Sequence, residues 1–174
     1  MANLSLFCKV KPIILGNNIE GALLLHMAFQ NLQGPLMSQA IGDILTNVLA
    51  RLKEQPMSKT FQRVLLEVFY SAMILDVNIT LEFLQHAGFL EEFFRLALDS
   101  WRSLRLSYER KLFALAMTNF LFNSAVPASL QEKSPIILRE LVSLLIRQQR
   151  IDQKMALAAS SKKKGKKGVN HIID

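Results

Sequence analysis

The sequence predicts an all-α protein: a short α-solenoid of helical hairpins followed by a disordered basic tail. Three observations predict this class. Apolar residues recur at steps of three and four along most of the chain, no useful length shows the alternation typical of strands, and Pro, Gly, Asn or Ser break the periodic segments. The 174 residues are 51% hydrophobic and 20% charged, so the chain can bury a core as one domain.

The N-terminal part contains one predicted helix, preceded by a segment whose secondary structure is harder to predict. A proline and a glycine break any long helix within residues 1–17, whose apolar side chains indicate a short helix or an irregular cap. Asn18 predicts the N-cap of a helix that runs to about Leu32. The pair Gly34-Pro35 then ends this helix, because proline cannot continue the backbone hydrogen bonding.

Two long helices follow, and the loop between them predicts a helical hairpin. One apolar stripe predicts a helix over about 37–54, which Pro56 ends. Ser58 predicts the N-cap of the next helix, over about 59–75. The apolar face of this second helix is wide enough for packing on two sides. A loop of about three or four residues joins the two helices, so we expect antiparallel neighbours.

The next segment predicts two shorter helices. Asn78 predicts the N-cap of a helix over about 79–86, and Gly88 separates it from a helix over about 90–101. Phenylalanines supply the apolar face of the second of these helices. Trp101 lies near its end, where we interpret the indole as a packing anchor.

Two further helices complete the predicted fold. Ser107 predicts the N-cap of a helix that runs to about Asn123; because Arg110 stands three residues on, we expect no capping box there. The last helix starts after Ser134-Pro135, with proline at the first helical position, and frays by about Ala159.

The composition changes at residue 160, which divides the chain into a helical domain over 1–159 and a lysine-rich tail over 160–174. Five lysines lie between 162 and 167, and without them the formal charge falls from +7 to +2. We therefore predict a nearly neutral body and a tail that cannot form a core. The lysines suit a nuclear-import signal or a phosphate-binding patch, and the alternative is a solvated, non-specific tail.

Known reactive patterns are absent from the sequence. There is no glycine-rich phosphate loop, the three histidines are scattered, and the single cysteine, Cys8, belongs to no Cys/His cluster with metal-ligand spacing. We expect no enzyme, no cofactor and no bound metal. Neither a membrane span nor a signal peptide is predicted, so we expect a cytoplasmic and nuclear protein.

Paired in order, the predicted helices form three or four hairpins of roughly 35 to 50 residues, the length class of HEAT and armadillo repeats. The hairpins share no consensus, so periodicity alone leaves a solenoid and a compact all-α bundle both open.

Several motifs occur in an order that resembles a known family. An Arg51-Leu52 pair ends one helix, a Thr80-Leu81-Glu82 segment follows, and an aromatic helix leads to Trp101. The run Tyr108-Glu109-Arg110-Lys111-Leu112-Phe113-Ala114-Leu115-Ala116 then opens the next apolar helix. From about residue 36 onwards this order is similar to the C-terminal HEAT repeats of the importin-β (karyopherin) transport receptors, in particular the importin-seven and importin-eight branch.

The resemblance implies a non-catalytic scaffold that binds a protein cargo or adaptor in nucleocytoplasmic transport. Family members are several times longer, and their Ran-binding end is an N-terminal arch without a counterpart here, so the resemblance implies a fragment or a short relative. Binding of Ran is expected only as part of a longer chain. Members of this branch also carry an acidic tract after these repeats, where this chain has lysines.

Glu109, Arg110 and Lys111 are the candidate binding residues, because they lie at a helix start beside a loop. The alternative is a solvated helix end with local charge pairing. The alternative function is a nucleic-acid-associated helical adaptor that uses the basic tail, and its affinity would fall steeply with salt.

Overall fold

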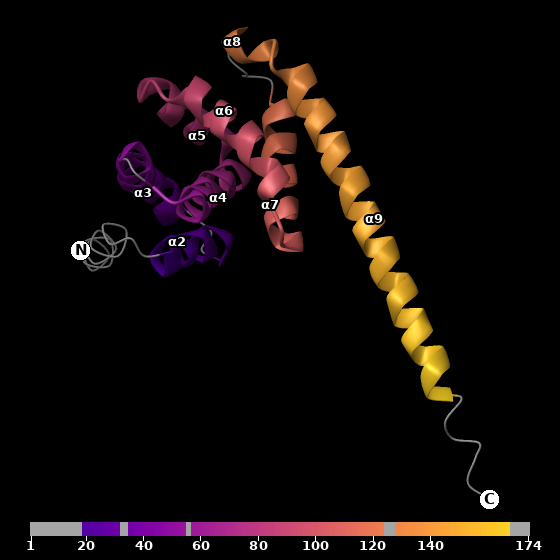
Figure 1. Ribbon diagram of the computed structural model, residues 1–174. Helices are drawn as coiled ribbons and strands as arrows, with labels where there is room; N and C mark the ends of the chain where they lie inside the picture. Colours follow the sequence, from indigo (N-terminus) through magenta and orange to yellow (C-terminus); the bar gives the residue numbers. More distant parts are fainter. Residues whose placement is uncertain (1–18, 32–34, 55–56, 124–127, 168–174) are drawn as a thin grey trace, which may run out of the picture.

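The structure is a computed structural model that describes residues 19–31, 35–54, 57–123 and 128–167. These residues form helices and contain no strand, so the all-α prediction is confirmed (Figure 1). The helices are α2 (Ile19–Asn31), α3 (Pro35–Lys53), α4 (Lys59–Leu75), α5 (Val77–His86), α6 (Leu90–Ser100), α7 (Ser107–Leu121), α8 (Ala128–Gln131) and α9 (Ser134–Lys167), and a 3-10 turn, η1 (Trp101–Ser103), follows α6. The expectation for residues 1–17 lies outside the described residues.

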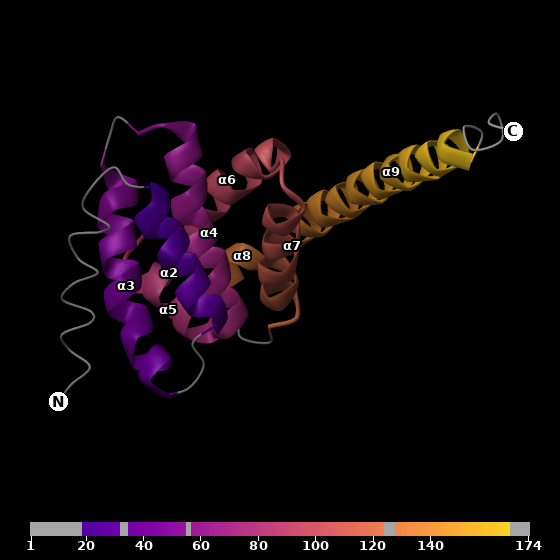
Figure 2. The same ribbon diagram turned by 90° about the horizontal axis from the view of Figure 1, so that it is seen from below.

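Helix α4 is the centre of the packing. It is buried along most of its length, as the wide apolar face of its sequence predicted, and its most extensive contacts are with α2 on one side and α7 on the other. Helix α9 packs against α7, so α2, α4, α7 and α9 contact one another in series (Figures 1 and 2). Helices α3 and α5 contact each other and also α4, which covers a further side of that helix.

Aromatic rings from α4, α6 and α7 fill the core where these helices meet. Tyr70 lies edge-on to Phe113, with 5.5 Å between ring centroids, and Phe94 lies 4.6 Å from Phe120. These rings are fully buried. Each such pair adds about 0.5–1.5 kcal/mol beyond the burial of its surface. Trp101 is buried at the end of α6, as predicted.

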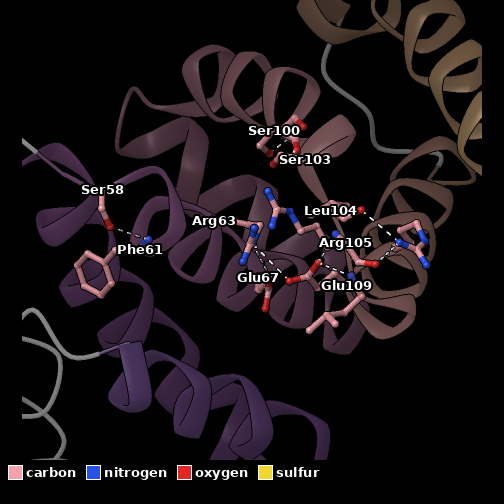
Figure 3. A network of polar contacts seen from close by, with 12 residues as sticks. Ser58, Phe61, Arg63, Glu67, Ser100, Ser103, Leu104, Arg105 and Glu109 are labelled. Carbon is pink, nitrogen blue, oxygen red and sulfur yellow. Dashed lines mark hydrogen bonds and ion pairs between the residues drawn. The ribbon is translucent and has the colours of Figure 1, made fainter.

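The predicted cap of α4 is confirmed, and that of α5 is wrong. The Ser58 hydroxyl accepts the Phe61 N–H at 3.2 Å (Figure 3). Helix α5 is capped by Asp76, whose carboxylate accepts the Ile79 N–H at 3.0 Å, and Asn78 lies inside the helix. Asp76 also donates its N–H to Ala72 and has an extended backbone, so it ends α4 and starts α5. With no residue left for a turn, the cap falls two positions earlier than predicted.

Helix α7 also starts differently from the prediction. Ser107 is its first residue and Leu106 stands at the N-cap, where an apolar side chain can accept no hydrogen bond. The Glu109 carboxylate instead reaches back and accepts the N–H groups of Arg105 and Leu106, at 2.7 and 2.8 Å. This is the glutamate half of a capping box, which the sequence analysis ruled out by counting from Ser107.

The C-terminal region differs from the prediction in two ways. The short helix α8 precedes α9, and α9 continues to Lys167 where the sequence predicted a helix that ends near Ala159. A formed helix extends at little cost, and lysine is a good helix former. Much of α9 runs beyond the packed helices (Figures 1 and 2). Residues 168–174 lie outside the described residues. No described helix is long and apolar enough to cross a membrane.

Candidate functional site

A groove of about 610 Å³ lies where α2, α4 and α7 meet. Its walls are mainly apolar, and one serine, one tyrosine and one lysine add polar groups. Phe29 comes from α2, and the other lining residues, from α4 and α7, are Ser71, Ile74, Leu75, Tyr108, Lys111, Leu112 and Leu115.

Exposed apolar side chains on α2 and α7 extend the apolar surface of these two helices. Leu24 and Met27 of α2 are 60% and 54% exposed, and Leu115 of α7 is 55% exposed. Lys111 is exposed and brings a positive charge to the lining. The groove itself is therefore apolar with a cation, a combination that suits a protein segment with apolar and acidic side chains.

A buried histidine joins α2 to α4 beside this groove. The Ser71 hydroxyl donates to the backbone carbonyl of Glu67 at 2.9 Å, so it has no proton left for His26. The contact of 2.5 Å between His26 Nδ1 and Ser71 Oγ therefore makes Nδ1 the donor. Burial lowers the pKa of His26, which keeps the ring neutral. In this tautomer Nδ1 cannot accept a proton from Ser71, so the pair is a structural contact rather than an activated nucleophile.

Two of the predicted binding residues are buried, and the first is Glu109. One of its carboxylate oxygens lies 3.4 Å from Arg63 Nε of α4, and the other binds the two backbone N–H groups at the start of α7 (Figure 3). Glu67 of α4 lies on the same guanidinium, at 3.8 Å. Burial raises the pKa of Glu67 to about 7, with a further increase from the charge of Glu109 and a partial offset from Arg63. This cluster anchors α7 to α4.

Arg110 is the second buried candidate, and it holds the chain segment before α7. Its guanidinium donates to the carbonyls of Leu104 and Arg105, at 3.2 and 2.5 Å, and to Gln148 of α9 at 2.5 Å. Of the three candidates, Lys111 alone lines the groove. The run Glu109-Arg110-Lys111 therefore divides into two residues that position α7 and one that lines the groove.

Sequence reasoning missed the other groove residues because they come from three separate helices. The available signal was Leu115, a large apolar side chain that is exposed on α7. The proximity of the groove residues depends on how α2 and α7 pack against α4, which periodicity does not define.

No metal centre accompanies this groove: within the described residues, no group of three or more His, Cys, Asp or Glu side chains could hold an ion. In comparisons with known proteins, no family model, no curated protein and no solved structure matches this chain.

Proposed function

We propose that this chain is a non-catalytic protein-binding scaffold that holds a segment of a partner protein in the groove between α2, α4 and α7. The observation that carries the proposal is the groove itself, with its apolar walls, the exposed Leu115 and the Lys111 cation. An apolar groove between helices suits the apolar face of an amphipathic helix. Lys111 favours a partner with an acidic residue next to that face.

The scaffold is a short solenoid of HEAT-like hairpins in this proposal. Two features support it. Helices α2, α4, α7 and α9 contact one another in series, as one layer of a solenoid would, and α3 and α5 pair beside them. Stacked hairpins present a long surface made by successive helices, and small rotations between them adapt it to a partner.

Nucleocytoplasmic transport is the process we propose for the scaffold, with a protein cargo or adaptor as partner and both cytoplasm and nucleus as its location. The support is the resemblance of residues 36 onwards to the C-terminal repeats of importin-β-type receptors. The Glu109-Arg110-Lys111 run of this resemblance borders the groove: Glu109 and Arg110 fix the start of α7, and Lys111 lines the groove. Ran would bind only a longer chain.

The binding proposal is tested with a displayed library of helical peptides selected on the full chain. Selected peptides are expected to share apolar residues at i, i+3 or i+4, and i+7, with an acidic residue beside them. Leu115→Asp should abolish their binding. Leu138→Asp is the matched control, because Leu138 of α9 is also 55% exposed and lies outside the groove. Equal binding by both variants would overturn the groove as the site.

Two further measurements test separately the charge of the partner and the role in transport. Lys111→Glu should change the selected charge from acidic to basic, and an unchanged selection would refute the role of Lys111. A selected peptide fused to a fluorescent reporter should change its nuclear-to-cytoplasmic ratio when the chain is co-expressed, but not with Leu115→Asp. If the peptide binds and the ratio stays constant, the scaffold stands and the transport role is wrong.

A further inference from the structure

The positive charge of this protein is concentrated on one helix. Residues 147–167 contain eight Lys or Arg and one Asp, so this segment accounts for the whole formal net charge of +7. It belongs to the part of α9 that follows the buried residues Ile137, Leu141 and Leu144. From residue 149 to 158, all but one of the side chains are exposed. The segment spans roughly 30 Å at the rise of an α-helix.

Three of these cations lie on one side of α9. Arg147, Arg150 and Lys154 follow one another at i, i+3 and i+7, which places them along one face of a helix. All three are exposed and line a shallow depression of about 400 Å³ together with Ser143, Ile146 and Ile151. Arg147 also donates to the backbone carbonyl of Arg102 at 2.9 Å, which ties this side of α9 to η1.

The nearby carboxylates leave the three cations uncompensated. Glu140 lies 3.5 Å from the guanidinium of Arg102 and 3.2 Å from that of Arg139, so one negative charge faces two positive ones. Asp152 accepts a hydrogen bond from Gln148 and, by helical spacing, lies on the opposite side of α9 from Arg150 and Lys154. Within the described residues, Arg150 and Lys154 take part in no ion pair. We call Arg102, Arg139, Arg147, Arg150 and Lys154 the basic ridge.

We propose that the basic ridge binds the phosphate backbone of a nucleic acid, at a site separate from the α2–α4–α7 groove. Exposed arginines suit phosphate because their planar guanidinium can donate two hydrogen bonds to it. Five further lysines follow at 162–167, in the last turns of the same helix. No residue from 147 to 167 is aromatic, so no base stacking is expected, and binding is independent of sequence.

A lipid surface fits this segment less well than a nucleic acid does. Its large apolar residues are Ile151, Met155 and Leu157; helical spacing places Ile151 and Met155 on one side of α9 and Leu157 on another. With two apolar side chains on one side and no aromatic residue, this segment has little to insert between headgroups. The phosphate backbone requires only an array of accessible cations.

The test is a titration of a labelled 20-base-pair DNA duplex with the full chain, followed by fluorescence anisotropy at 50 to 200 mM KCl. The ridge variant replaces Arg147, Arg150 and Lys154 with Gln. The control variant replaces Lys53, Lys59 and Arg95, three exposed cations on other helices, with Gln and so loses the same net charge. A third variant replaces the five lysines at 162–167 with Gln.

The ridge variant should bind at least tenfold more weakly than wild type at 100 mM KCl. Its slope of log K against log salt should be less steep by up to about 2.7, because each phosphate contact contributes about 0.9. The control variant should stay within about threefold of wild type. Equal losses in the ridge and control variants would mean that only net charge matters, and would overturn the ridge.

Three other outcomes would also refute the proposal. If the ridge variant binds like wild type and the 162–167 variant loses binding, the lysines alone are the site. If poly-glutamate competes as well as the duplex at equal charge, the surface is not directed at phosphate. If the chain binds vesicles with phosphatidylserine and leaves the duplex free, the partner is a membrane surface.

Discussion

Glu109 of α7 and Arg63 of α4 form an ion pair inside the protein, with 3.4 Å between the carboxylate oxygen and Nε. The Glu109 side chain is almost completely buried. Its other oxygen accepts the two backbone N–H groups that begin α7. One carboxylate therefore closes the N-terminus of a helix and attaches that helix to the central α4.

Glu109→Ala should destabilise the fold by about 2–4 kcal/mol, because it leaves the two backbone donors at the start of α7 without their acceptor and removes the nearer of the two carboxylates beside Arg63. Urea unfolding followed by circular dichroism measures this change. Glu82→Ala is the control, since Glu82 is an exposed glutamate of α5, and its effect should stay within about 0.5 kcal/mol. A similar small effect at Glu109 would show that water replaces the carboxylate.

Glu67 predicts an unusual dependence of stability on pH. Its pKa in the folded protein is about 7, above its ordinary value of 4.5, so the folded state binds this proton more tightly than the unfolded state does. The stabilisation is complete below pH 4.5 and is lost as pH rises through 7. A shift of this size corresponds to about 3 kcal/mol, because one pKa unit is 1.36 kcal/mol.

Glu67→Gln removes this titration. The stability of the variant relative to wild type should therefore be higher at pH 8 than at pH 5. The measurement is the free energy of unfolding of both proteins at each pH. Comparing the pair cancels His26, whose lowered pKa acts in the opposite direction by removing stability as pH falls. Parallel pH profiles for the two proteins would contradict the elevated pKa of Glu67.

The apolar stripes on α2, α3, α4 and α9 made most helices predictable, because buried side chains must recur on one face. Caps were harder, since Asp76 and Asn78 are both good caps, and Asp76 is selected only because α4 and α5 meet at this single residue. The groove was not predictable from periodicity. Glu109, Arg110 and Lys111 occupy successive directions around α7, and only packing against α4 determines which of them faces out.

Phe113 and Phe122 provide a matched test of the aromatic core. Phe113 is fully buried against Tyr70, whereas Phe122 is 86% exposed just after α7. Phe113→Ala should cost about 3–5 kcal/mol, through lost burial and a residual cavity, and Phe122→Ala should cost less than about 0.5 kcal/mol. Thermal and urea unfolding measure both. A cost at Phe122 similar to that at Phe113 would mean that Phe122 contacts the fold more closely than its exposure indicates.

Gly88 closes α5 in a conformation that other residues rarely adopt. Its φ is +62°, and its N–H donates to the Gln85 carbonyl while Phe89 donates to the Leu84 carbonyl, at 3.0 and 2.9 Å. These two bonds form a Schellman motif, in which an apolar contact is common between the positions that Phe89 and Leu84 occupy, and both of these side chains are buried. The positive φ is therefore required to end α5 and direct the chain into α6.

Two Gly→Ala substitutions should consequently change stability in opposite directions. Gly88→Ala should destabilise by about 1 kcal/mol, since a Cβ is strained at positive φ even though no atom lies within 4 Å of it. Gly42→Ala should stabilise by about 0.5–1 kcal/mol, because Gly42 lies within α3 and its Cβ would also meet no atom within 4 Å. Unfolding free energies in urea measure both changes. Two changes of the same sign would contradict the assigned backbone of one of these glycines.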